Sequence, residues 1–149
     1  MLILHSDNRG GEMEETIAQL ELRRTRLYEQ MAALGDLRRG SISVNFRKCG
    51  KSNCACSRAG HRGHGPQYLW NTTIGGKSLA ENVRLGPALE KVRKEVENHR
   101  TFVRWCKEVV EINEKLCRLR PVKEVQDEQE LEALKKKLQK QFAGKLNKK

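Results

Sequence analysis

Three of the five cysteines lie within eight residues of one another, and this cluster constrains the fold more than any other feature of the sequence. Cys49, Cys54 and Cys56 are followed closely by His61 and His64. Three thiols and an imidazole at this density are the usual ligand set of a structural zinc site. The odd number of cysteines argues against a closed disulfide framework. We therefore expect Zn²⁺ to hold this segment together and to supply folding energy that its sparse apolar residues lack.

Either histidine can complete the ligand set, but His64 is favoured over His61. Gly63 gives the chain a flexible approach to His64, and Pro66 gives it a rigid exit toward the next strand. Reduced surface thiols and a redox-active thiol are the alternatives to a zinc site. No Asp or Glu occurs between Arg38 and Leu79, whereas a catalytic zinc usually needs a nearby carboxylate as general base. We therefore expect a structural metal and no enzymatic activity.

Alternation of polar and apolar residues predicts a small antiparallel sheet around this cluster. Ser41–Arg47 alternates with period two, and Gln67–Ile74 and Ser78–Leu85 are further strands. Gly75-Gly76 is typical of a hairpin turn between the last two of them. A three-stranded sheet that holds a metal-binding loop resembles a zinc ribbon in architecture.

Long amphipathic helices flank this module, so the predicted fold class is α+β. A helix from about Glu12 ends at Gly35, a second opens at Pro87 and ends at Pro121, and a third covers about Val122 to Phe142. The predicted organisation is a flexible leader at 1–11, helix one at 12–34, the zinc-binding β module at 35–86, the long helix at 87–120, and the C-terminal helix with its basic tail at 121–149.

Heptad spacing predicts a coiled-coil type of pairing between the first two helices. The seam of helix one comprises Met13, Ile17, Leu20, Arg24, Leu27, Met31 and Leu34, and that of the long helix comprises Leu89, Val92, Val96, His99, Val103, Cys106, Val110, Asn113 and Cys117. Cys106 and Cys117 are therefore expected in the core, with His99 and Asn113 fixing the register. The long helix exceeds its partner by about a third of its length. Either the C-terminal helix or a second subunit must cover the remainder, and a homodimer through these helices is the favoured arrangement.

The net charge of +11 is concentrated in the middle of the chain. Residues 35–79 carry eight basic side chains and one acidic side chain. A concentrated basic field attracts polyanions, so nucleic acid is the expected partner, with DNA favoured over RNA. The expected contacts are Arg38, Arg39, Arg47, Lys48, Lys51, Arg58, Arg62, Tyr68 and Trp70. Tyr68 and Trp70 are able to stack on unpaired bases, but packing of the small sheet against a helix is the favoured role for both.

No stretch of about 18 consecutive apolar residues occurs, so no membrane span is expected. The apolar run at the start is too short for a signal peptide, which makes a cytoplasmic location the expectation. The predicted function is that of a zinc-stabilised nucleic-acid-binding protein, accessory or regulatory in DNA transactions. The alternatives are a coiled-coil adaptor between proteins and an RNA-binding subunit of a nucleoprotein complex.

The string from Arg47 to Leu69 resembles the signature of an uncharacterised prokaryotic family of short basic proteins. Its elements are Cys49-Gly-Lys, Cys54-Ala-Cys56 and His64-Gly-Pro66-Gln-Tyr68, followed by a hairpin and a long helix. The resemblance covers about residues 35–120 and implies that Cys49, Cys54, Cys56 and His64 form the matched set. Members are often found near transposase-like genes, which implies an association with mobile elements.

Overall fold

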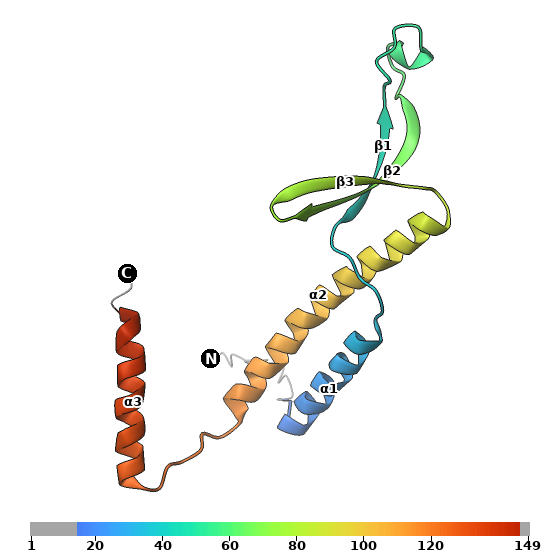
Figure 1. Cartoon of the computed structure of the whole chain (residues 1–149). Helices are drawn as coiled ribbons and strands as arrows, with labels where there is room; N and C mark the ends of the chain where they lie inside the picture. The colour runs from blue at the N-terminus through green and yellow to red at the C-terminus, as the bar shows by residue number, and fades with distance from the viewer. Residues whose placement is uncertain (1–14, 147–149) are drawn as a thin grey trace, which may run out of the picture. The chain divides into compact units, whose positions relative to one another are not determined.

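The computed structural model describes residues 15–146, with the side chains described up to residue 144, so the predicted leader at 1–11 lies outside this range. The elements follow in the order α1 (Ile17–Ala33), β1 (Ser41–Arg47), a single 3₁₀ turn (Ala55–Ser57), β2 (His64–Ile74), β3 (Lys77–Val83), α2 (Pro87–Leu119) and α3 (Glu128–Leu146). The fold is α+β, as predicted, with a helix, a sheet and two further helices in that order (Figure 1). The chain divides into two compact units, residues 1–117 and 118–149, which are described separately.

The sheet is antiparallel throughout, with the strands in the order β1-β2-β3. Gly75 and Gly76, at φ 55° and 77°, make the tight turn between β2 and β3 that the sequence predicted. β2 begins at His64, three residues before the expected start, and β3 ends at Val83 rather than Leu85. The earlier start of β2 places the last residue of the Cys/His cluster on the strand itself, opposite Arg47 of β1.

Helix α1 begins at Ile17 and not at Glu12, because a capping box fixes its first turn. The hydroxyl of Thr16 accepts the backbone N–H of Gln19 at 3.3 Å, and the Gln19 side chain accepts the backbone N–H of Thr16 at 2.9 Å. The helix ends before Gly35, whose φ of 80° favours glycine.

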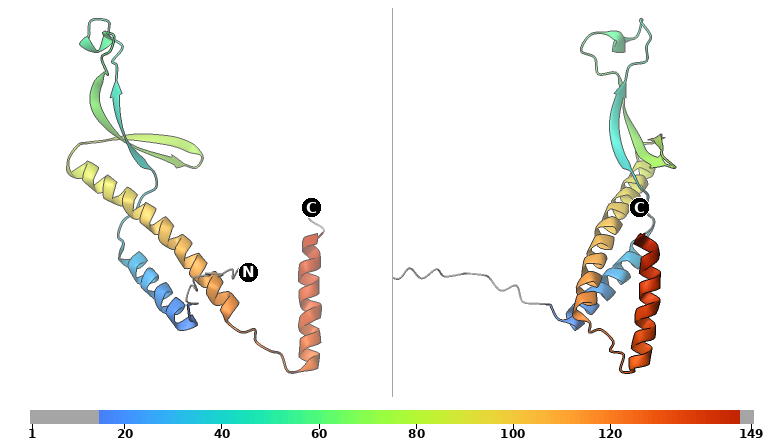
Figure 2. Two further views of the ribbon diagram at one scale, coloured as in Figure 1. Left: turned by 180° about the vertical axis from the view of Figure 1, so that it is seen from behind. Right: turned by 90° about the vertical axis from the view of Figure 1, so that its left-hand side faces the viewer.

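Helices α1 and α2 lie side by side and bury the apolar core of the first unit (Figures 1 and 2). The cluster consists of Leu20 and Leu27 from α1 and of Val109, Ile112 and Leu116 from α2, with Ile17, Met31 and Trp105 packed against it. The residues of α1 are those that the heptad pattern predicted. Arg24 also reaches the other helix, since its guanidinium donates to Oδ1 of Asn113 at 2.9 Å.

The predicted seam of the C-terminal half of α2 is wrong. Val103 and Val110 remain 52% and 55% exposed. Cys117 is exposed and Cys106 only half-buried, so the expected core role fails for Cys117. The reason is that the apolar stripe of α2 is wider than one heptad seam. Helix α1 packs on one side of that stripe. The other side, which contains the residues at heptad spacing, remains uncovered.

A polar junction fastens the sheet to α2. The backbone N–H of Arg38 donates to the backbone carbonyl of Glu95 at 3.1 Å, and Nε of Arg38 lies 2.6 Å from Oε2 of the same residue as an ion pair. Lys91 pairs with the other carboxylate oxygen of Glu95. The Arg38 guanidinium also lies 4.7 Å from the centre of the Trp70 ring in β2. Asn98 holds the preceding segment, because its amide donates to the backbone carbonyls of Leu34 and Asp36.

Helix α3, described by itself, starts at Glu128 and not at Val122. The carboxylate of Asp127 accepts the backbone N–H of Glu130 at 2.7 Å and so defines the first turn. Leu131 is half-buried, while Leu134 and Leu138 are exposed. Among the helices of residues 15–146, none combines the length and apolarity that crossing a bilayer requires.

Replacing Leu20, which is fully buried, tests the core between α1 and α2. We expect Leu20→Ala to lower the free energy of unfolding by about 2–5 kcal/mol, because the truncation leaves a cavity among packed side chains. The matched control is Leu22→Ala on the same helix, since Leu22 is 52% exposed and its truncation should change stability by less than about 0.5 kcal/mol. Urea denaturation followed by circular dichroism measures both, and equal losses would contradict this core.

Candidate metal centre

The Cys/His cluster lies in the loop between β1 and β2, at the end of the hairpin that points away from α2 (Figures 1 and 2). Backbone hydrogen bonds from Cys54 to Lys51 at 3.2 Å and from Ser57 to Cys54 at 3.0 Å coil the middle of the loop. The hydroxyl of Ser57 donates to the carbonyl of Cys54 at 2.7 Å and to that of Ser52 at 3.0 Å. These local bonds turn Cys54 and Cys56 toward the two ends of the loop.

The ligand atoms of Cys49, Cys54, Cys56 and His64 all lie within 4.8 Å of one another. The sulfurs of Cys49 and Cys56 are 3.4 Å apart, and the sulfur of Cys54 is 3.2 Å from Nε2 of His64. A tetrahedral zinc ion with bonds of about 2.3 Å to sulfur and about 2.0 Å to nitrogen requires edges of about 3.5–3.8 Å. The two short separations lie just below that size and no other exceeds 4.8 Å, so the four residues could bind a metal ion.

A close approach of the two ends of the loop demands glycine at position 63. Gly63 is buried at φ 106°, and a Cβ there would lie 2.7 Å from the carbonyl carbon of Arg47. Any larger residue would push the His64 strand away from Arg47, its register partner. Gly60, by contrast, has open space around it, although its φ of 80° also favours glycine.

The surroundings of the thiols favour at least one thiolate near neutral pH. A hydrogen bond from the backbone of Lys51, aided by His64 and Cys56, lowers the pKa of Cys49 to about 6. The backbone N–H of Cys49 lowers the pKa of Cys56, but burial and the neighbouring thiols outweigh it, so that pKa lies above its usual value. Since metals bind thiolates, the Cys49 sulfur is already in the form that a metal ion takes.

His61, the alternative ligand of the sequence analysis, is used differently. Its Nδ1 accepts the backbone N–H of Gly63 at 2.9 Å, and the residue is exposed outside the four-residue cluster. The structure therefore brings together the set that contains His64.

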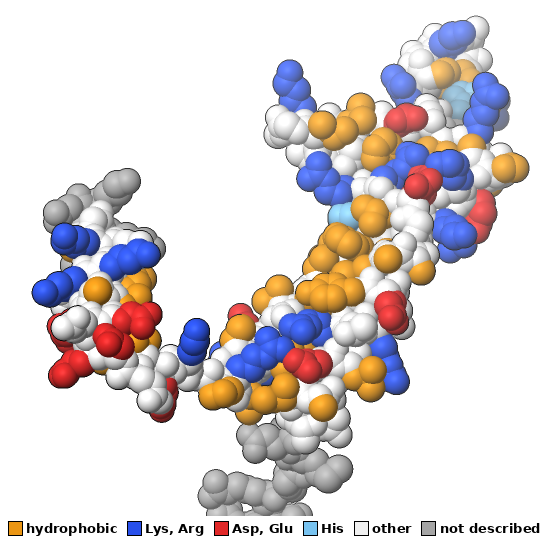
Figure 3. Space-filling view, turned by 60° about the horizontal axis from the view of Figure 1, so that its bottom comes forward, with side chains coloured by type: hydrophobic (Ala, Val, Ile, Leu, Met, Phe, Trp, Pro, Cys, Tyr) orange, Lys and Arg blue, Asp and Glu red, His pale blue; other side chains and the backbone are white. Residues whose placement is uncertain are grey.

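The predicted nucleic-acid contacts separate into two groups. One group surrounds the loop and consists of exposed cations, namely Arg47, Lys48, Lys51, Arg58 and Arg62. Figure 3 shows Lys and Arg side chains gathered around this end of the molecule. Within this group, the Arg62 guanidinium lies 4.9 Å from the centre of the Phe46 ring, which holds it beside the strand.

The second group lies at the other end of the sheet, where several members are engaged within the protein. Arg38 pairs with Glu95 and covers Trp70. The indole N–H of Trp70 donates to the carbonyl of Arg39 at 2.9 Å. Tyr68 is half-buried. Trp70 is therefore engaged with the segment before β1, and the packing of the two aromatic residues against a helix stays a prediction.

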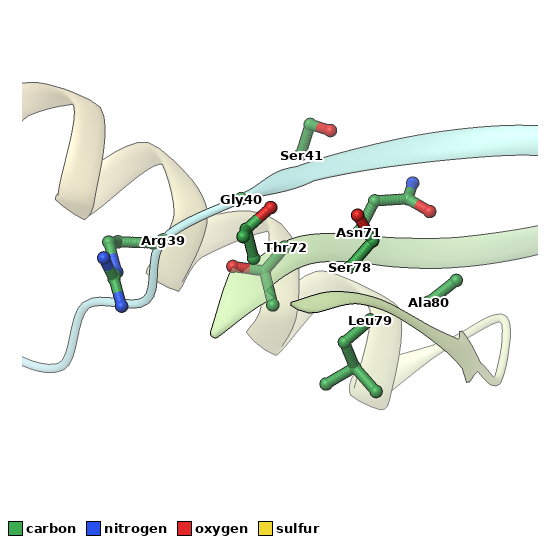
Figure 4. Close-up of a pocket in the computed structure, with 9 residues that line it drawn as sticks. Arg39, Gly40, Ser41, Asn71, Thr72, Ser78, Leu79 and Ala80 are labelled. Carbon is green, nitrogen blue, oxygen red and sulfur yellow. The ribbon is translucent and has the colours of Figure 1, made fainter. Parts of the chain in front are cut away.

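Sequence reasoning missed an open hollow of about 590 Å³ at the turn end of the sheet (Figure 4). Its lining comprises Arg39, Gly40, Ser41, Asn71, Thr72, Thr73, Ser78, Leu79 and Ala80. Gly40 permits the close approach there, since a Cβ would lie 2.2 Å from the carbonyl oxygen of Asn71. The repeated small polar residues were the available signal, but strand alternation alone did not show which of them share a face.

Comparison with known protein families identifies the family of this chain. The model of the Domain of unknown function (DUF6788) matches residues 17–94. The chain belongs to this family. The matched region runs from the start of α1 through the whole sheet and its Cys/His loop into α2. Comparisons with curated proteins and with solved structures gave no match.

Loss of one ligand should abolish metal retention without unfolding the helices. We expect Cys54→Ala in the full chain to lower zinc affinity by more than about 100-fold, since it removes a ligand and not merely a supporting contact. Cys117→Ala is the matched control, because Cys117 is exposed and lies outside the cluster. Metal analysis after dialysis, with circular dichroism at 222 nm, measures both quantities. Equal zinc content in the two variants would contradict this centre.

Proposed function

We propose that this chain is a zinc-stabilised protein that binds duplex DNA as an accessory or regulatory factor. The observation that carries the proposal is a four-ligand cluster of the zinc type at the tip of a hairpin whose exposed side chains are cationic. The role proposed is binding and not catalysis. The same loop binding RNA is the principal alternative.

The donor set favours zinc among the common metals. Three thiolates and one imidazole match the preference of Zn²⁺ for sulfur and nitrogen in a tetrahedron, whereas magnesium and calcium prefer oxygen. Four protein ligands fill a tetrahedron, which fits a closed structural site better than one that keeps a position open for a substrate, although only Cys56 of the four is buried. A bound ion would also fix the positions of Lys51 and Arg58, which lie between or beside the ligands.

The charge distribution supports a polyanionic partner. No acidic residue occurs from residue 37 to residue 80, so nothing in the loop or in β1 and β2 neutralises the cations there. Three thiolates and Zn²⁺ together add about one negative charge, which leaves a large positive excess. Cations on a rigid loop contact phosphates with little loss of conformational entropy.

Salt dependence provides the test of DNA binding. We expect the affinity of the full chain for a duplex to fall steeply as the salt concentration rises. The Lys51→Ala/Arg58→Ala double variant should reduce the slope of log K against log salt by about 2, because each phosphate contact contributes about 0.9. Arg26→Ala is the control, since Arg26 is an exposed cation on α1. Fluorescence anisotropy at several salt concentrations measures the slopes. No binding at low salt would overturn the proposal, and tighter binding to RNA would favour the alternative.

We further propose that the uncovered stripe of α2 joins two copies of the chain. The stripe consists of Val103, Cys106, Val110 and Cys117 and keeps the spacing of a coiled-coil seam. Figure 3 shows hydrophobic side chains gathered along this helix. In an antiparallel pair with Val110 against Cys106 of the second copy, the flanking positions bring Arg100 near Glu114 of that copy. Opposite charges at such positions favour pairing.

Charge placed on the stripe should separate the two copies. We expect the wild-type chain to run as a dimer in size-exclusion chromatography with light scattering, and Val103→Glu/Val110→Glu to run as a folded monomer, because a buried glutamate without a partner is costly. Arg104→Glu, one residue away and exposed, should remain dimeric. A monomeric wild-type chain would contradict the proposal and assign the stripe to a different protein.

A further inference from the structure

One face of the sheet is built almost entirely from uncharged polar side chains. The strand register places Ser43, Leu69 and Asn82 side by side, and likewise Ser41, Asn71 and Ala80. The uncharged positions of this face, here called the polar face, are Ser41, Ser43, Asn45, Gln67, Asn71, Thr73, Ser78 and Asn82. Leu69 and Ala80 complete it. In Figure 4, Ser41 and Asn71 point to one side of the sheet and Leu79 to the other.

This composition opposes the usual preferences of strands. Asparagine is depleted in β-sheets, yet Asn45, Asn71 and Asn82 all occupy strand positions on the polar face. Solvated sheet faces usually carry threonine and charged residues, which favour strands and solubility. Residues that go against the preference of their secondary structure, without an apparent gain in stability, are expected at functional sites.

Most of these side chains are free to bind a partner. Asn71 is committed, because its amide donates to the hydroxyl of Ser43 at 2.8 Å. Asn45, Gln67 and Asn82 have no side-chain hydrogen-bond partner within residues 15–144. Asn45 and Asn82 are exposed and Gln67 is half-buried. The face therefore offers several carboxamides, each with donors and an acceptor.

The placement of charge leaves the polar face open to DNA. Glu81, the only acidic residue of the three strands, is the register partner of Trp70 and so lies on the opposite face. Trp70 on that opposite face is covered by Arg38, which is paired with Glu95 of α2, so part of the opposite face is engaged by the segment before β1. Cations stand just before β1 at Arg39 and at its end at Arg47, where they can contact phosphates.

We infer that the polar face enters the major groove of duplex DNA and reads the edges of the bases. The inference rests on the proposed function and specifies which groups recognise sequence. The major groove, about 12 Å wide, admits a two-stranded β-ribbon, and carboxamides pair there with the N6 and N7 positions of adenine while hydroxyls accept or donate to any base. The base contacts then come from Asn45, Gln67 and Asn82, on the face opposite Tyr68 and Trp70.

Selection from a pool of duplexes with 20 random base pairs tests the inference with the full, zinc-loaded chain. We expect enrichment of one sequence motif. Asn45→Ala, Gln67→Ala and Asn82→Ala should each reduce the ratio of affinities for the selected and a scrambled duplex by about 5- to 100-fold, because each removes a base contact. Affinity for the scrambled duplex and the salt slope should not change.

Two controls separate base reading from other effects. Val44→Thr alters an exposed residue of the opposite face and should keep the ratio unchanged. Arg47→Ala should weaken both duplexes equally, because a phosphate contact carries no sequence information. Zinc content and circular dichroism of each variant exclude misfolding.

The outcomes distinguish the two proposals. Salt-dependent binding without an enriched sequence, or an unchanged ratio in all three alanine variants, would overturn base reading and leave DNA binding intact. Equal affinity for a double-stranded RNA of the selected sequence would also overturn it, because the major groove of RNA is too narrow to admit strands. Failure to bind any duplex would overturn both.

Discussion

The buried carboxylate of Glu95 is the constraint on which the arrangement of the first unit depends. It is 6% exposed and is balanced by Lys91 from its own helix and by Arg38 from the segment between α1 and β1. A buried charge that loses its partner is strongly destabilising, so the Arg38 segment is held against α2. Because Arg38 also covers Trp70, the same side chain links β2 to the junction with α2. The segment that enters the sheet is thus held by this ion pair together with the backbone bond to Glu95 and the bonds of Asn98.

Local chemistry made much of this structure predictable from sequence. Glycine, proline and strand alternation located β1 to the residue, the turn at Gly75-Gly76 and the start of α2. The density of thiols located the cluster, because four ligands within sixteen residues can meet through a single loop. The order of elements followed from these local signals.

Features that depend on contacts between distant segments were not predictable in the same way. Heptad spacing located the buried residues of α1, and Val92 and Val96 in the first half of α2, but not those of its C-terminal half, since it cannot show which side of a wide apolar stripe receives the partner. Val109 and Ile112 are buried there while Val103 is exposed. Likewise, alternation located the strands, but only the register showed that Asn45, Asn71 and Asn82 share a face. The start of α1 is set by the capping pair Thr16 and Gln19. The glutamates before this pair are also typical of a first helical turn, so the sequence predicted an earlier start.

The structure separates its tasks by location. Apolar packing between α1 and α2 stabilises one end, the junction at Glu95 holds the segment that enters the sheet, and the Cys/His loop occupies the far end of the β1–β2 hairpin. The family match covers α1, the sheet and the Cys/His loop, and it ends at residue 94, before Glu95 and the core residues of α2. The Cys/His loop and the polar face of the sheet are therefore not needed to hold the helices of the first unit together.

The closing of the Cys/His loop within a single hairpin has a consequence for assembly on the ribosome. All four ligands have left the ribosome once His64 has emerged, before any part of β3 or α2 leaves it. The four ligands can therefore meet during translation, whereas the core of α1 must wait for Val109, Ile112 and Leu116. A metal ion bound by the loop would then be captured before the helices pack.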